Sequence, residues 1–394
     1  MPVNADSPKF SILHVLTLNG RNGEYGGPVR VARELCSELN SRGHSTRIFT
    51  GALKGSEPIS KPGLDETFVL VKPLLKRLPM SSLWSWKLLR SLHKMVQKSD
   101  VIHVHFARDL IPFLAAFLAI LNKKPFISQT HGMIIPDGRT ITRLIDLIFT
   151  KYLIGQSRTN LVLTQKELAL THKLFKSVPS MILPNGIFVD MSLELKKDFT
   201  NKIVFCSRLH KRKGLDKFIQ IAQEYKKTQL SFEIYGPDEG ELHFIETEIK
   251  NRNLEETVQY KGSLPAESVQ KILLDADLLV LPSQNEPFPM VILEAIAVGT
   301  SVLIMPSCGL ADSLRNYNPD FVSENEEIDE IVRTFNRIVC SKIDQEKRTN
   351  IRNFAQKEFS IAAVADVLIE IYRDLVNEEI IVRLNTRKNK NAGF

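Results

Sequence analysis

Two carboxylates eight positions apart lie in the stretch NEPFPMVILEAIAVG, residues 285–299. Glu286 precedes a predicted helix, and Glu294 lies inside it, where its side chain leans back toward the helix N-terminus. Both carboxylates are therefore expected to face one pocket, where they could accept hydrogen bonds from the hydroxyls of a sugar or a ribose. Glu294 could instead only stabilise the helix dipole. A glutamate within the apolar run LEAIAV needs a partner, however, which favours a functional site.

Cationic residues follow another apolar run, in the stretch SRLHKRKG at residues 207–214. Arg208 comes directly after the strand-like run, and Lys213 stands five positions later, before Gly214 and an amphipathic helix. An arginine fork and a lysine ammonium beside a helix start suit a diphosphate. The residues between them, 210–212, are expected to be solvated, as charge runs usually are.

A glycine pair stands in a third loop, NGRNGEYGGPVR at residues 19–30. Gly26 and Gly27 precede Pro28, a residue that suits the first position of a helix. The loop indicates either a phosphate site at a helix N-terminus or a plain tight turn, and its residues do not decide between them. It lacks the GxGxxG spacing, which counts against a dinucleotide cofactor.

Histidines follow or occupy two of the strand-like runs. His131 ends the run PFISQTH and is a candidate for a cleft, although a lone histidine is more often structural. His103 and His105 share one face of a predicted strand. Without a third ligand, they do not predict a metal site.

Strand-like and helical segments alternate along the chain, which predicts parallel sheets covered on both faces. The strand-like runs form two series, FSILHVL, STRIFTG, DVIHVHF, PFISQTHG and TNLVLTQ, and then NKIVFCS, LSFEIYG, VQYKGSL, ADLLVLPS and TSVLIMP. We therefore expect two doubly wound domains, at 1–190 and 191–375, and a C-terminal segment with a flexible tail at 376–394. Ligands of such sheets bind beyond the carboxyl ends of the strands, so a cleft between the domains is the expected site.

Charge is unevenly distributed, since residues 1–200 hold 27 of the 52 Lys and Arg but only 15 of the 45 Asp and Glu. This asymmetry suggests an anionic partner, and the lack of a nucleic-acid motif favours a membrane surface. The segment 72–98, with leucines, Trp84, Trp86 and many cations, could lie on a bilayer or could be a helix that covers the core. The apolar run 111–121 is too short to span a bilayer. Widely separated cysteines and the lack of a secretory leader indicate a cytoplasmic protein.

The motifs together resemble the retaining, nucleotide-sugar-dependent glycosyltransferases of family 4, which have the GT-B fold of two facing Rossmann-like domains. The resemblance rests on GGPVRVARELCSEL, on THG at 130–132, LPNGI at 183–187, SRLHKRKGLD, EIYGPDEGE and EPFPMVILEAIAVG, in the order expected of the family. It departs from the pattern at Ser207 and Pro289, where glycine is usual, and in the stretch MPSCGLADS.

The resemblance implies a role for each motif residue. Catalysis would involve His131, Arg208, Lys213 and Glu286. The donor would be bound by Gly26, Gly27, Arg208, Lys213, Gly236, Glu286, Phe288, Met290, Val291 and Glu294, with Glu294 on the ribose and His131 beside the transferred sugar.

The resemblance also implies a reaction. The cations would stabilise a departing nucleoside diphosphate without a metal or another cofactor, and the sugar would keep its anomeric configuration. The donor would be a UDP- or GDP-sugar, and the acceptor would be a lipid-linked molecule or a saccharide in cell-surface polysaccharide or glycolipid synthesis. The alternatives are a hydrolysing epimerase and a non-catalytic module that binds nucleotide sugars.

Overall fold

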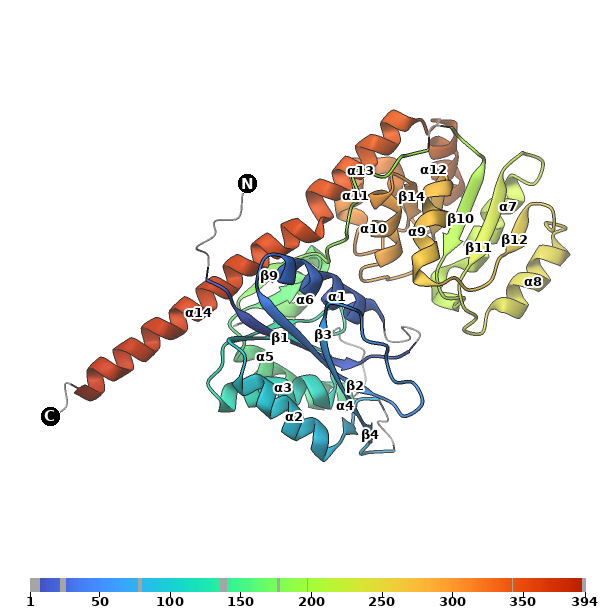
Figure 1. Ribbon diagram of the computed structural model, residues 1–394. Helices are drawn as coiled ribbons and strands as arrows, with labels where there is room; N and C mark the ends of the chain where they lie inside the picture. Colours follow the sequence, from blue (N-terminus) through green and yellow to red (C-terminus); the bar gives the residue numbers. More distant parts are fainter. Residues whose placement is uncertain are drawn as a thin grey trace. The chain divides into compact units, whose positions relative to one another are not determined.

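The computed structural model describes residues 8–21, 26–76, 80–134, 140–175, 178–196, 198–341 and 343–391, in two compact units (Figure 1). Unit 1 comprises residues 1–186 and 361–394, and unit 2 comprises residues 187–360. The chain therefore passes from one unit to the other twice. Two α/β units with parallel sheets confirm the predicted fold class.

Unit 1 alternates strands with helices through most of its length. Its elements are β1 (Ser11–Leu18), α1 (Gly26–Ser41), β2 (Ser45–Ala52), β3 (Asp65–Leu70), β4 (Lys72–Pro73), β5 (Leu83–Trp84), α2 (Trp86–Gln97), β6 (Val101–His105), α3 (Leu110–Leu121), β7 (Phe126–Gln129), α4 (Thr140–Ile145), the π-helix η1 (Asp146–Thr150), α5 (Lys151–Gly155), β8 (Asn160–Val162), α6 (Gln165–Leu174), β9 (Ser180–Ile182) and α14 (Ile361–Asn391).

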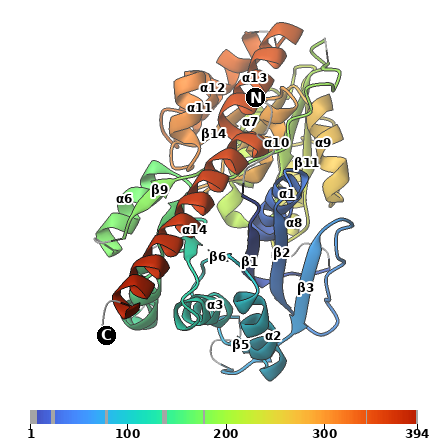
Figure 2. The same ribbon diagram turned by 60° about the vertical axis from the view of Figure 1, so that its left-hand side comes forward.

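The sheet of unit 1 has seven parallel strands in the order β3-β2-β1-β6-β7-β8-β9. The order reverses at β1, so the switch point lies between β1 and β6, where His14 is in register with His103. Buried side chains of α2, α3 and α5 cover one face of the sheet, and those of α1 and α14 cover the other. The ribbons of α1, α2, α3 and α14 can be followed in Figure 2. Burial of these apolar faces is what holds the two helical layers on the sheet.

Unit 2 repeats the alternation on a smaller scale. Its elements are β10 (Lys202–Cys206), the 3-10 helix η2 (Lys211–Lys213), α7 (Leu215–Glu224), β11 (Ser231–Tyr235), α8 (Leu242–Asn251), β12 (Val258–Tyr260), α9 (Ala266–Asp275), β13 (Leu278–Leu281), α10 (Met290–Ala297), β14 (Ser301–Ile304), α11 (Ala311–Tyr317), the 3-10 helix η3 (Pro319–Phe321), α12 (Ile328–Cys340) and α13 (Gln345–Phe359).

The five strands of unit 2 are parallel, in the order β12-β11-β10-β13-β14. The chain leaves β10 in one direction and later returns to its other side, so the switch point lies between β10 and β13. Because parallel crossovers are right-handed, α7 and α10 lie on opposite faces of the sheet. A T-shaped contact between Phe218 and Phe232 and a stacked contact between Phe232 and Phe335 fill the core under α7 and α12.

The C-terminal region differs from the sequence-based boundaries. Residues 361–375 pack in the core of unit 1, where Leu368 and Tyr372 are buried, rather than with the second domain. The helix also continues to Asn391, through the segment expected to be flexible from residue 376. No proline or glycine interrupts residues 361–391, and apolar residues continue to Leu384, which favours a helix longer than expected. Among the described residues, none of the helices has the length and apolar character that spanning a bilayer requires.

Candidate functional site

The proposed catalytic cation and carboxylate of unit 2 meet at its switch point. Lys213 follows β10, Glu286 follows β13, and Lys213 Nζ donates a hydrogen bond of 2.6 Å to Glu286 Oε2. Both side chains are largely buried, with exposed fractions of 11% and 15%. The open α/β sheet thus places an ion pair at the edge where such sheets bind ligands.

The loops that carry this pair are held by their backbones. Gln284 N–H donates to Arg212 C=O at 3.0 Å, which joins the loop after β13 to the turn before Lys213. Gly309 N–H donates to the carbonyl of Glu286 at 2.8 Å. These bonds fix the backbone on which the Lys213 and Glu286 side chains stand.

Arg208 lies in a more open environment than Lys213. Its side chain is 58% exposed, and its Nη1 donates to Glu239 Oε1 at 2.8 Å. Exposed ion pairs of this kind contribute little free energy, typically about 0–1 kcal/mol. The guanidinium can therefore exchange Glu239 for another anion at low cost.

Close backbone packing explains why glycine occupies position 236. This residue has φ +148°, and a Cβ at its position would lie 1.8 Å from the carbonyl oxygen of Ser207. Gly236 also accepts a hydrogen bond of 2.9 Å from the Tyr260 hydroxyl on its carbonyl oxygen. The loop after β11 is thus pressed against the segment that leads to Arg208.

Glu294 lies in the second turn of α10 and is buried, as predicted from its apolar surroundings. Burial raises the pKa of the Cys206 thiol, at the end of β10, to about 12, and the charge of Glu294 adds to this shift. Phe288 is buried, while Met290 and Val291 at the start of α10 are partly exposed. The E-x7-E stretch thus begins just after the carboxyl end of β13 and continues into α10.

The glycine pair of unit 1 stands at the start of α1, which begins at Gly26. A Cβ at Gly27 would meet no heavy atom within 4 Å, so packing does not explain that glycine. Residues 22–25 of the loop lie outside the described part of the chain.

His131 is buried in a strained turn after β7. It has φ +49°, a region that few residues other than glycine adopt, and Gly132 follows with φ +71°. Glu167 of α6 holds the turn, since its Oε1 accepts 2.6 Å hydrogen bonds from Thr130 Oγ1 and from the Gly132 N–H. Burial lowers the pKa of His131 to about 4, so the ring is neutral at pH 7.

A layer of histidine side chains lies behind that turn. His105 Nδ1 is 2.7 Å from His131 Nε2, and His105 Nε2 is 3.1 Å from His14 Nδ1. His103 lies 2.7 Å from the Tyr372 hydroxyl and 3.0 Å from Gln129 Oε1. One ring nitrogen each of His14, His103 and His105 falls within 4.8 Å of the others, so β1 supplies the third histidine that sequence spacing did not reveal.

Sequence reasoning missed Glu167, Glu239 and His14. Glu167 is three residues after Thr164, and this capping spacing is a visible helix signal, but nothing local shows that its carboxylate reaches residues 130 and 132. His14 is 89 residues from His103 and becomes its neighbour only through strand pairing.

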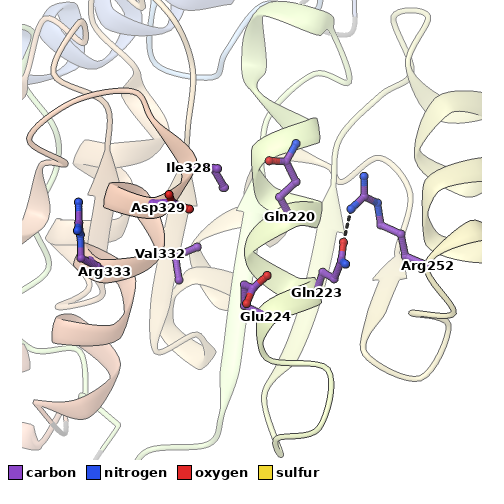
Figure 3. A pocket seen from close by; sticks show the side chains of 8 residues that line it. All are labelled: Gln220, Gln223, Glu224, Arg252, Ile328, Asp329, Val332 and Arg333. Carbon is purple, nitrogen blue, oxygen red and sulfur yellow. Dashed lines mark hydrogen bonds between the residues drawn. The ribbon is translucent and has the colours of Figure 1, made fainter.

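The cavity drawn in Figure 3 lies elsewhere in unit 2, on α7, α8 and α12. Its lining includes Glu224 and Asp329 as well as Arg252 and Arg333, and Arg252 is hydrogen-bonded to Gln223. It contains none of the motif residues. Opposite charges within the lining leave it without a clear preference for an anion or a cation.

Two models of known protein families together match most of the chain. Residues 25–190 match the family model described as Glycosyltransferase Family 4, and residues 191–358 match the model described as Glycosyl transferases group 1.

Among curated proteins, the 2-deoxystreptamine N-acetyl-D-glucosaminyltransferase of Niallia circulans is 27% identical over 54% of this chain, a match that spans 60% of the relative. The UDP-Gal:alpha-D-GlcNAc-diphosphoundecaprenol alpha-1,3-galactosyltransferase of Escherichia coli is 24% identical over 82% of this chain and 88% of its own length.

Among solved structures, Anabaena HepE in complex with UDP-glucose has a TM-score of 0.68 and 15% identity, covering 93% of this chain and 100% of that chain. The sucrose-phosphate synthase of Thermosynechococcus elongatus has a TM-score of 0.69 and 17% identity, with 94% and 100% covered. These structures share the fold over 93–94% of this chain. Because both family models also match, one after the other along the sequence, the chain belongs to the family 4 glycosyltransferases of GT-B fold.

Proposed function

We propose that this protein transfers a sugar, with retention of anomeric configuration, from a nucleoside diphosphate donor to an acceptor hydroxyl. The observation that carries the proposal is the ion pair of Lys213 with Glu286 at the switch point of unit 2. The pair brings a diphosphate-binding cation and a hydroxyl-binding carboxylate together where the transferred sugar would join the diphosphate.

Each partner has bonding capacity for the donor. Lys213 carries three N–H donors and gives one to Glu286, so others can bond phosphate oxygens. Glu286 uses Oε2 for Lys213 and can accept a sugar hydroxyl on Oε1. As the glycosidic bond breaks, negative charge grows on the diphosphate, and preorganised cations that meet this charge lower the barrier. The leaving phosphate then takes the proton of the acceptor hydroxyl.

The donor is proposed to be a UDP-sugar first and a GDP-sugar second. The Escherichia coli relative has UDP-Gal in its name, and Anabaena HepE was solved with UDP-glucose. Glu294, buried in α10, is the group proposed to bind the ribose.

The acceptor is proposed to be a lipid-linked molecule or a saccharide, reached at the cytoplasmic face of a membrane. The name of the Escherichia coli relative contains a diphosphoundecaprenol acceptor. In unit 1, α2 turns its buried Leu88, Leu92 and Val96 to the core, so its apolar face is not available to lipid. Trp86 at its start is 69% exposed.

Further apolar side chains are exposed on neighbouring elements of unit 1. They are Leu74, Leu75, Phe117, Leu144, Leu147, Ile148, Phe149 and Tyr152. Together with the excess of lysine and arginine in residues 1–200, they support contact with an anionic bilayer. Co-sedimentation with phosphatidylglycerol vesicles, compared with phosphatidylcholine vesicles, tests this part: equal or absent binding contradicts it.

The donor is tested first by thermal shift against UDP-, GDP-, ADP- and dTDP-sugars, because a ligand at 100 times its dissociation constant stabilises by about 2.7 kcal/mol. Lys213→Ala should abolish the shift and lower turnover by about 10²- to 10³-fold. Lys211→Ala is the matched control, since Lys211 is exposed on the same turn and should keep both properties. Release of free sugar without transfer to any acceptor would support a hydrolysing enzyme instead. A Lys213→Ala variant with normal turnover would refute the catalytic role.

A further inference from the structure

The buried histidine layer of unit 1 contains a chain of three rings that ends at His131. The chain runs from His14 through His105 to His131, with nitrogen-to-nitrogen distances of 3.1 and 2.7 Å. His105 stands between the other two and uses one ring nitrogen for each. The His131 ring also has the side chain of Asn185 as a hydrogen-bond partner, in the segment that leads out of unit 1.

Hydrogen bonding restricts where the protons of this chain lie. A neutral imidazole has one N–H and one lone pair, so each link fixes the tautomer of the next ring. His14 Nε2 is fully buried and has no hydrogen-bond partner among the described residues. A buried N–H without an acceptor is rare in proteins. The favoured state therefore has a bare lone pair on His14 Nε2, with the N–H of His14 on Nδ1.

That starting point determines the remaining rings. His14 Nδ1–H donates to His105 Nε2, so His105 carries its proton on Nδ1 and donates it to His131 Nε2. His131 is then left with its own proton on Nδ1, which the side-chain oxygen of Asn185 would accept, with the amide orientation assigned from this network. The reverse arrangement would bury the Nε2–H of His14 without an acceptor among the described residues.

The backbone of His131 is held separately from its ring. Glu167 Oε1 bonds Thr130 and Gly132 on either side of the histidine, at 2.6 Å each. Its other oxygen accepts the N–H of Leu163 at 2.8 Å, which ties the turn to β8. The turn is thus fixed by Glu167, whereas the orientation of the ring depends on His105 and Asn185.

We propose that His105 is a positioning residue for sugar transfer, because it holds the ring of His131 in one orientation and in the Nδ1–H tautomer. The inference rests on the proposed function, in which His131 lies beside the transferred sugar. In that role the position of the ring affects turnover more than it affects donor or acceptor binding.

Two conservative substitutions distinguish the roles of the two ring nitrogens of His105. The amide of His105→Asn stands as far from Cβ as Nδ1 does, so it can still bond His131 and loses only His14. The amide of His105→Gln stands as far out as Nε2, so it keeps His14 and loses His131. His103→Asn and His103→Gln are the matched controls, since His103 is equally buried and stacks on His105 at 4.6 Å but bonds Gln129 and Tyr372.

Sugar transfer should distinguish these variants. We expect His105→Gln to lower kcat about 10- to 100-fold with little change in KM, the size of effect that a misplaced group at a reaction centre produces. His105→Asn should recover most of that loss, and both His103 variants should keep kcat. Equal losses in the His103 and His105 variants, or no recovery by His105→Asn, would show that the layer serves only stability.

Nitrogen-15 NMR of histidine-labelled protein tests the tautomer without any substrate, with His131 assigned from a His131→Asn spectrum. At pH 7 the wild type should show His131 protonated on Nδ1 alone, and His105→Gln should lose this single state. A proton on Nε2, or rapid exchange between the two nitrogens, would overturn the proposal, as would one equivalent of zinc retained by the purified wild type. Failure of every donor to support transfer, with His131 still protonated on Nδ1 alone, would refute the proposed function. It would not refute the contact by which His105 orients the His131 ring.

Discussion

Acid should destabilise unit 1 before most carboxylates titrate, because its buried histidines resist protonation. Burial lowers the pKa of His14 from 6.5 to about 3 and that of His131 to about 4. The pKa values of His103 and His105 are lowered as well, chiefly by burial. Below pH 6.5 the unfolded chain binds protons at these positions and the folded chain does not, so stability falls as the pH falls.

The size of the effect follows from the ordinary pKa. At pH 5 the pH is about 1.5 units below the pKa of a histidine in the unfolded chain. Each such histidine therefore lowers the free energy of unfolding by about 2 kcal/mol. His14 and His131 together should therefore remove about 4 kcal/mol between pH 7 and pH 5, a large part of a typical stability of about 5–15 kcal/mol. The loss should continue down to the lowered pKa values of the folded state.

Tryptophan fluorescence in urea measures this change in unit 1 alone, since the chain has two tryptophans and both Trp84 and Trp86 lie in that unit. The His14→Asn variant removes one titrating ring and keeps an amide near the Nδ1 position. It should be less stable than the wild type at pH 7 but lose about 2 kcal/mol less on going to pH 5. Equal losses in the two proteins would refute the reasoning from burial.

Two further predictions concern unit 2. Gly236→Ala should lower the melting temperature and the thermal shift given by the donor, because the new Cβ would overlap the Ser207 carbonyl. The control Gly240→Ala, also at positive φ but facing open space, should cost only about 1–2 kcal/mol in chemical unfolding. An equal effect of the two substitutions would contradict this account. Asp277→Asn should cost about 3–5 kcal/mol by circular dichroism, since it leaves the fully buried guanidinium of Arg348, now 2.8 Å from the carboxylate, without a counter-charge. Unchanged stability of Asp277→Asn would argue against that cost.

The strands and the ligand-binding edge could be predicted because they depend on local signals. Each of the ten strands predicted from apolar runs between turn residues is present, and Lys213 and Glu286 lie in the predicted loops after two of them. That these two strands are neighbours is seen only in the strand order of the sheet. Short edge strands such as β9 were missed, since three half-buried residues carry little periodicity.

Long-range contacts were beyond the reach of local patterns. The return of α14 to unit 1 depends on the packing of Leu368 and Tyr372 on one face of the sheet. The strands of that face lie almost 200 residues, or more, before α14 in the sequence. The bond between His103 and Tyr372 joins positions 269 residues apart. The roles of the individual site residues remain predictions, with Lys213 and Glu286 in direct contact and Arg208 bonded to Glu239.

The double passage of the chain between the units has a consequence for synthesis on the ribosome. Unit 2 is one continuous segment and can fold once residue 360 has emerged, whereas unit 1 must wait for α14 although most of it is made first. Until then, the sheet face formed by Ile12, Ile127 and Leu161 has α1 but lacks α14, the second helix that covers it. Stalled nascent chains ending near residue 360 should therefore be more sensitive to protease in unit 1 than released full-length chains. The first unit to be translated is the last to be completed.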